Sequence, residues 1–216
     1  MLNGPFSESI VKRSVSKNLV SIKIVNMRDF GVGTRRTVDD TAYGGGVGML
    51  LRVDVVRRAI DAVYDKSLTK QGQKVILLSA AGKKFDQKKA KTFSKLKHLI
   101  LVCGHYEGVD YRIRNFIDLE ISIGDFVLTG GEIPAMTITD SVVRLISGVL
   151  KKDATKFESF TDNILEYPQY TKPPIYEGLK VPSVLLSGNH KKILEWRKTE
   201  ALKQTKRNRP DLLKAE

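Results

Sequence analysis

The apolar pattern contains three short uninterrupted runs, at residues 75–78, 99–103 and 126–128. Each run ends in a turn rich in small residues, at 79–82, 104–108 and 129–132. Continuous apolar runs of this length are typical of strands in a parallel sheet that is covered on both faces. The pattern therefore predicts an α/β fold with a mostly parallel sheet.

Helical spacing accounts for the longer segments of the first part of the chain. Residues 52–64, 86–96 and the stretch from Pro134 to Val149 carry apolar residues on one face. Helical crossovers join parallel strands and bring their carboxyl ends to one edge of the sheet. Open α/β sheets bind ligands at that edge, so we expect the three turns to gather there.

Other segments predict the remaining organisation. We expect the end of a helix over 10–17, a strand over 19–25 and a long functional loop over 28–49. Residues 151–163 indicate a linker, and 164–216 a small basic domain with a helix after Asn189 and another after Pro210. The predicted domains are thus 1–150 and 164–216, joined by the linker.

The glycine pair Gly130–Gly131 is predicted to reach positive φ and to let a ligand approach the backbone. Pro134 fits the first turn of the helix that follows. A tight connection between a strand and a helix, without any ligand, explains the same pattern.

Charge narrows the class of partner. Lys and Arg outnumber Asp and Glu by 37 to 24, a net charge of +13. This favours a polyanionic partner such as RNA or DNA, although a basic surface without such a partner is an alternative. The lysine-rich stretch 83–97 is expected to be a solvated face.

Several classes of protein are disfavoured. No apolar run approaches the roughly 20 residues needed to span a bilayer, and the start lacks the apolar core of a secretory signal. Cys103 is the only cysteine, which excludes an internal disulfide and suits a reducing cytoplasm. It ends an apolar run and is interpreted as a core thiol, not a nucleophile.

Nucleotide and metal motifs are missing from the sequence. There is no phosphate-binding G-x-x-x-x-G-K-[ST], and residues 44–48 do not satisfy G-x-G-x-x-G. The histidines His98, His105 and His190 are scattered, so we expect no metal site. The four carboxylates close to turns are more informative: Glu107, Asp125, Glu132 and Glu158.

Five segments together resemble the bacterial tRNA (guanine-N1)-methyltransferase family. They are RTVDDTAYGGGVGM, CGHYEGVD, SIGDFVLTGGEIPAMTITDSVVR, EYPQYTKP and VPSVLLSGNHKKILEWR. They follow the order of the family and extend over residues 4–213, which makes the match far more specific than any single glycine motif.

The resemblance implies an S-adenosylmethionine-dependent enzyme of the SPOUT class. It implies a trefoil-knotted α/β domain, a small helical C-terminal domain that binds tRNA, and a homodimer with each active site at the interface. The expected reaction is methylation of N1 of the guanosine 3′ of the anticodon, position 37. A need for Mg²⁺ cannot be read from the sequence.

Site residues follow from the resemblance, position by position. Arg144 matches the catalytic arginine, and Glu158 takes the place of the aspartate base. The guanosine is expected to meet Asp39, Tyr43, Gly48 and Met49. The methyl donor is expected to contact Leu77, Ser79, Ala80, Gly82, Gly104, Glu107, Ile123, Gly124, Phe126, Leu128, Gly130 and Gly131.

The chain also departs from the family pattern. Glu158 replaces the usual aspartate, residues 80–81 a common Pro-Gln, and Leu77 and Phe126 a common tyrosine each. The chain begins after the family's first β-strand, so either that strand is absent or the start codon is misassigned. Two other functions stay open: an RNA-binding relative without activity, and a SPOUT methyltransferase with another target nucleotide.

Overall fold

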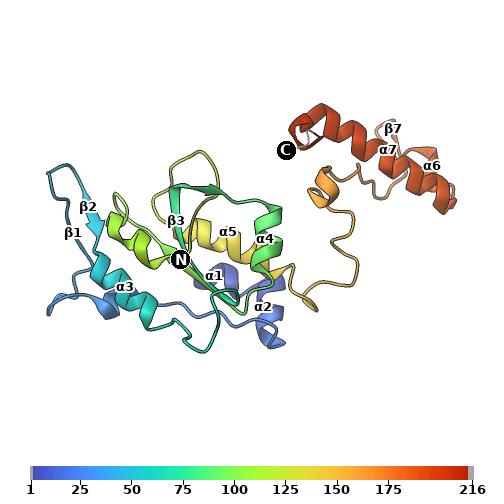
Figure 1. The fold of residues 1–216 in the computed structure, drawn as a ribbon. Helices are drawn as coiled ribbons and strands as arrows, with labels where there is room; N and C mark the ends of the chain where they lie inside the picture. The colour runs from blue at the N-terminus through green and yellow to red at the C-terminus, as the bar shows by residue number, and fades with distance from the viewer. Residues whose placement is uncertain (1, 214–216) are drawn as a thin grey trace. The chain divides into compact units, whose positions relative to one another are not determined.

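The chain divides into two compact units, Met1–Leu150 and Lys151–Glu216. The computed structural model describes residues 2–213, which Figure 1 colours from blue to red along the chain. Position 1 of the first predicted domain and positions 214–216 of the second lie outside the described residues.

A three-stranded parallel sheet forms the centre of the first unit (Figure 1). The strands are β3 (Gln73–Lys84), β4 (His98–Cys103) and β5 (Leu119–Ser122). Their order is β4-β3-β5, and both neighbours pair with β3 in parallel. The predicted α/β class with a parallel sheet is confirmed.

One face of the sheet packs against α3 (Val53–Asp61) and the 3-10 helix η2 (Tyr111–Phe116). Val75 and Leu77 of β3 belong to this core, which continues into Val55 and Val56 of α3. Successive residues of a strand point to opposite faces, so Val75 and Leu77 enter this core together.

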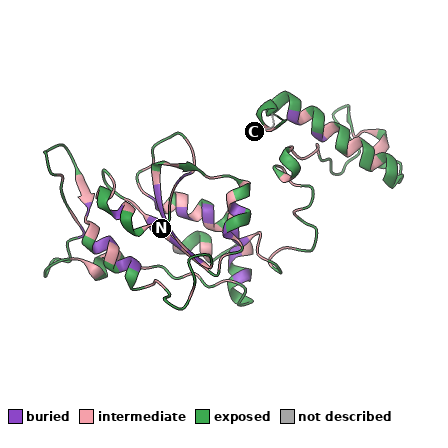
Figure 2. Ribbon diagram, in the orientation of Figure 1, coloured by how far each residue is buried: buried purple, intermediate pink, exposed green. Residues whose placement is uncertain are grey.

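The other face packs against α4 (Gln87–Phe93) and α5 (Glu132–Val143). Ile76 and Leu78 of β3 join Ile138 of α5 in this second core. The sheet is therefore covered on both faces, as the uninterrupted apolar runs predict. In Figure 2 the buried residues of the first unit lie along these strands and the sides of the helices that meet them.

Short elements complete the first unit. Before the sheet come α1 (Asn3–Phe6), α2 (Ser9–Ser16), the 3-10 helix η1 (Met27–Phe30) and the antiparallel strands β1 (Asp39–Thr41) and β2 (Met49–Leu51). Strand β1 and the first residue of β2 lie inside the segment 28–49 that is predicted as a long loop, so that prediction is only partly right.

The second unit is built around the long helix α7 (His190–Asn208), capped by the Asn189 side chain, which accepts from Lys192 N–H at 3.1 Å. Only Ala201 and Thr205 are buried among its described residues. Thr205 Oγ1 accepts from Leu165 N–H at 2.8 Å. This hydrogen bond joins the segment 164–171, which forms no helix or strand, to α7. The other elements are η3 (Thr161–Asn163), β6 (Ile175–Tyr176), β7 (Leu179–Lys180), α6 (Ser183–Leu186) and η4 (Pro210–Leu213).

Two predicted strands are wrong. Residues 19–25 form no strand, and residues 126–128 lie in a loop, with β5 at Leu119–Ser122 as the third strand. Leu119–Ser122 escapes a search for apolar runs because Glu120 interrupts it; this carboxylate pairs with Arg114 at 2.7 Å. Conversely, Val127 of the apolar run is 90% exposed, so the run is not a buried strand.

Two element ends also differ from expectation. Strand β3 continues to Lys84 through the predicted turn 79–82, with its register to β5 shifting between Leu78 and Lys83. Helix α5 ends at Val143 rather than Val149. The predicted helices over 52–64 and 86–96 are confirmed as α3 and α4, and each ends about three residues before its predicted end.

The fully buried Ile138 gives a test of the second core. Ile138→Ala should lower the free energy of unfolding by about 2–5 kcal/mol, because it leaves a cavity beside β3. Urea titration followed by far-UV circular dichroism measures this. The single tryptophan, Trp196, lies in the second unit and should not report the change. The exposed neighbour Thr137→Ala is the control; an equal loss there would contradict the packing described.

Candidate active site

Two of the three predicted turns meet beyond the ends of the strands. His105 and Gly130 form an isolated antiparallel bridge, and Gly131 N–H donates to Gly104 C=O at 2.8 Å. His105 Nε2 lies 2.6 Å from Glu132 Oε1. The loop after β4 and the glycine turn before α5 therefore lie in contact at one edge of the sheet, and the donor contacts assigned to Gly104, Gly130 and Gly131 stay predictions.

The third predicted turn, 79–82, is part of strand β3 and runs beside β5. A Cβ on Gly82 would lie 2.4 Å from Ile121 N, so only glycine allows this approach. Ser79 Oγ accepts from Ala81 N–H at 3.2 Å, while Ala80 is exposed. Leu77 is buried in the core, and its side chain is not available as a surface contact.

The loop 123–128 after β5 holds four more predicted donor contacts. Ser122 Oγ donates to Gly124 C=O at 2.9 Å and accepts from Gly124 N–H at 3.2 Å. Gly124 lies directly against the Phe126 ring, where a Cβ would be 2.5 Å from Cε1. Phe126 is half exposed, and Ile123 and Leu128 are intermediate. The loop thus presents apolar side chains to solvent.

The glycine pair is needed for space and not for positive φ. Gly131 has φ −79°, and Gly130 is not among the glycines with positive φ, so that part of the prediction is wrong. A Cβ on Gly131 would lie 2.6 Å from Cys103 Cα, and one on Gly130 would lie 2.6 Å from Glu132 Oε2. The pair lets the turn press closely against the end of β4.

The hairpin predicted to meet the guanosine lies against the loop after β4. Glu107 N–H donates to Met49 C=O at 3.1 Å, and a Cβ on Gly48 would lie 2.4 Å from Glu107 Cγ. Tyr43 is fully exposed, and Asp39 pairs with Leu51 in the strand register. Predicted substrate and donor residues therefore come together at Gly48, Met49 and Glu107.

Burial explains the protonation state of the Cys103 thiol at the end of β4. Desolvation raises the pKa of its thiol to about 12, with a smaller contribution from the charge of Glu132. The thiol therefore stays protonated at neutral pH, which agrees with its interpretation as a core residue. His98 is also structural, since its Nδ1 lies 2.5 Å from Gln73 Oε1. Within residues 2–213 no cluster of three or more His, Cys, Asp or Glu could hold a metal ion.

The two predicted catalytic residues belong to different units. Arg144 follows the last residue of α5 and caps that helix in the first unit. Glu158 lies in the second unit, where its carbonyl oxygen accepts from Thr161 N–H at 3.1 Å. Their roles stay predictions.

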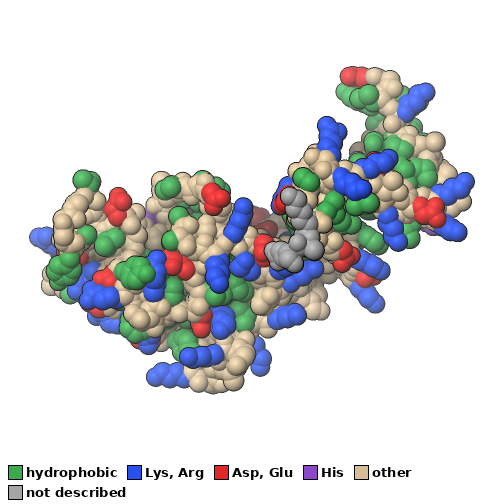
Figure 3. Space-filling view, turned by 45° about the horizontal axis from the view of Figure 1, so that its top comes forward, with side chains coloured by type: hydrophobic (Ala, Val, Ile, Leu, Met, Phe, Trp, Pro, Cys, Tyr) green, Lys and Arg blue, Asp and Glu red, His purple; other side chains and the backbone are tan. Residues whose placement is uncertain are grey.

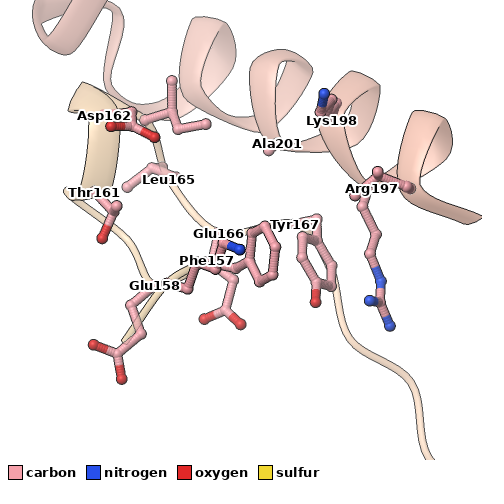
Figure 4. A pocket seen from close by; sticks show the side chains of 13 residues that line it. Phe157, Glu158, Thr161, Asp162, Leu165, Glu166, Tyr167, Arg197, Lys198 and Ala201 are labelled. Atoms are coloured by element: carbon pink, nitrogen blue, oxygen red, sulfur yellow. The ribbon is translucent and has the colours of Figure 1, made fainter. Parts of the chain in front are cut away.

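Glu158 lines a pocket between residues 156–167 and α7 (Figure 4). Arg197 extends from α7 alongside Tyr167, with its guanidinium carbon 4.8 Å from the ring centroid. No role for Tyr167 or Arg197 is predicted from sequence, because their contact joins positions that are 30 apart and share no motif. Glu158 shares the lining of this pocket with Tyr167 and Arg197, but its carboxylate points away from them in Figure 4.

The His105–Glu132 pair is the contact that sequence reasoning missed. Both residues stood in predicted turns at the same sheet edge, but no pattern indicated that they pair. The usable signal is the parallel sheet itself, which brings the segments that follow β4 and β5 to the same edge.

The positive charge forms no single patch on the face in Figure 3, where Lys and Arg side chains are spread over both units. Charge alone therefore does not locate a nucleic-acid interface. No helix in the described part of the chain has the length and apolar character needed to cross a membrane.

Comparison with known proteins assigns the chain to a family. The family model described as tRNA (Guanine-1)-methyltransferase TrmD matches residues 1–215. A tRNA (guanine-N(1)-)-methyltransferase of Dictyoglomus turgidum is 55% identical over 214 residues, which cover 99% of this chain and 85% of that protein. Proteins of the same description from Desulforudis audaxviator and Geobacillus kaustophilus are 50% and 49% identical, over 100% and 99% of this chain and 86% and 87% of theirs. The chain belongs to the tRNA (guanine-1)-methyltransferase TrmD family.

Proposed function

We propose that this protein methylates N1 of the guanosine 3′ of the tRNA anticodon, with S-adenosylmethionine as methyl donor. The observation that carries the proposal is the contact between the Gly48–Met49 hairpin end and Glu107, because it joins the predicted guanosine-binding and donor-binding residues. A methyl transfer needs both ligands within reach of each other.

The residues present fit the methyl donor. Glycine at positions 82, 130 and 131 allows the loops and the strand ends to pack in close contact, because a Cβ at any of them would meet a neighbouring atom at 2.4–2.6 Å. Backbone N–H and C=O groups recognise an adenine edge, and the exposed apolar atoms of Phe126 and Val127 suit its ring faces. When bound, S-adenosylmethionine supplies an electrophilic sulfonium methyl group.

Two side chains carry the proposed chemistry. Guanine N1 holds a proton at neutral pH, and the Glu158 carboxylate would take it as N1 forms its bond to the methyl carbon. The bond from that carbon to the donor sulfur would break at the same time, with its electron pair left on the departing thioether. Such general-base assistance contributes typically about 10²–10⁴ in rate. The Arg144 guanidinium stabilises negative charge that develops on guanine O6. Magnesium has no assigned residue in this proposal.

The proposed partners are tRNA and a second copy of the chain. In this proposal the linker 151–163 joins a knotted SPOUT domain to a tRNA-binding domain at 164–216, the active site lies at the interface of a homodimer, and the enzyme acts in the cytoplasm. Tyr43 is fully exposed and Val127 is 90% exposed in the single chain. Exposed apolar side chains of this kind support a site that a second copy of the chain covers.

The target nucleotide can be tested with two tRNA transcripts that differ only in G or A 3′ of the anticodon. We expect 1-methylguanosine from the G transcript alone, measured by nuclease digestion and mass spectrometry after incubation with S-adenosylmethionine. Methylation at another nucleotide would replace this target with that of a different SPOUT enzyme. Binding of tRNA without any product would favour an inactive relative.

The catalytic roles predict a loss of turnover with donor binding retained. Glu158→Gln should lower kcat by about 10²–10⁴, since the amide cannot accept the N1 proton. Arg144→Ala should lower kcat by about 10²–10³, and Arg144→Lys should restore only part of it because the planar fork is lost. Single-turnover kinetics measure both effects. Glu166→Gln, a second carboxylate beside the same pocket, is the matched control. Near-normal turnover in either test variant would remove that residue from the mechanism.

The basic helix α7 predicts a salt-dependent contribution to tRNA binding. Lys198→Gln combined with Lys206→Gln should reduce the slope of log affinity against log salt by up to about two, one for each lost phosphate contact. Filter binding across a salt series measures the slope. The equally charged change Lys12→Gln with Lys17→Gln, on exposed residues of the first unit, is the control. Equal slopes for both double variants would argue against α7 as the tRNA-binding element.

A further inference from the structure

The His105–Glu132 pair joins two loops that are distant in sequence. The residues are 27 positions apart, and His105 Nε2 lies 2.6 Å from Glu132 Oε1. An ionised carboxylate only accepts hydrogen bonds, so the imidazole Nε2–H donates to it. The pair is thus a hydrogen bond between the loop after β4 and the first residue of α5.

A shift of either side chain would also move the glycine turn, because Gly130 lies against both of them. A Cβ on Gly130 would lie 2.6 Å from Glu132 Oε2 and 2.9 Å from His105 Nε2, so the paired side chains pass directly over the Gly130 backbone. The backbone contacts of Gly130 with His105 and of Gly131 with Gly104 lie beneath the same pair.

The two ends of the pair differ in how firmly they are held. Glu132 is the first residue of α5, a helix anchored in the second core by Ile138. His105 precedes Tyr106, which has φ +59°, where the loop turns toward Gly108 and the hairpin. The Glu132 carboxylate, held by its helix, therefore restrains the loop after β4 through its hydrogen bond to the His105 ring.

We propose that the His105–Glu132 pair sets the spacing of the two donor-binding loops and that both are positioning residues for the methyl donor. This inference rests on the proposed function, because Gly104 and Glu107 on one loop and Gly130 and Gly131 on the other are the donor contacts assigned there. The pair adds little to global stability, since its side chains are 45% and 22% exposed.

Loop spacing is testable without any ligand. Amide hydrogen exchange at Gly131, whose N–H donates to Gly104 C=O, should quicken about tenfold in His105→Ala and in Glu132→Ala, while the thermal midpoint changes little. His105→Arg should restore slow exchange, because a guanidinium also donates to the carboxylate. The control is Asp61→Asn, which breaks an exposed ion pair of 2.7 Å with Arg57 far along the chain.

Donor binding supplies the second measurement. The Kd for S-adenosylmethionine, by calorimetry without tRNA, should rise about tenfold in each alanine variant and no further in the double variant, because one hydrogen bond is lost in all three. The KM for the donor should rise in parallel, with kcat at saturating donor and the KM for tRNA unchanged. His105→Arg should again recover binding.

Two results would overturn the proposal: unchanged exchange at Gly131 in both alanine variants, or a donor Kd that rises about a hundredfold in the double variant through independent effects. Failure of the proposed function has a different signature. In that case the unaltered protein would bind no S-adenosylmethionine, while the exchange comparison would still decide whether the pair holds the loops together.

Discussion

The pairing of β3 with a parallel strand on each side is the constraint on which the first unit depends. Its residues Val75 and Leu77 enter one core, and Ile76 and Leu78 enter the other, so one strand holds both layers of helices. Because β4 and β5 both run parallel to it, their following loops leave at the same edge. The loops that carry Gly104 and Glu107 and that follow β5 are therefore placed by this strand direction.

The sheet edge could be predicted because burial leaves a strong pattern in sequence. Helices α3 and α4 and strands β3 and β4 all carry apolar residues at the period of their element. Strand β5 lacks such a run because it contains Glu120. The carboxylate of this residue is accommodated in the sheet by its ion pair with Arg114. The apolar run 126–128 predicts a strand wrongly for the opposite reason: Phe126 and Val127 are exposed in a loop, and apolar residues alone do not show whether a segment is buried.

The candidate site was predicted by resemblance more than by pattern. The segments around Gly104 and Gly130 could be grouped from the parallel sheet alone, whereas the junction of Gly48 with Glu107 depends on how a hairpin docks. No period or spacing encodes that docking. Likewise, the roles of Arg144 and Glu158 come from matching positions in a family, since each lies at the end of a helix or in a turn where many charged residues occur.

The glycines of the site are required for two different reasons, positive φ and close approach, which a sequence cannot distinguish. Glycine is usually explained by positive φ, and Gly48 at φ +95° fits that account. Gly82 and Gly131 are needed for close approach, since a Cβ at either would meet backbone atoms at 2.4–2.6 Å. Backbone cannot move aside as a flexible side chain can, so any substitution there would push the loops away from the strand ends.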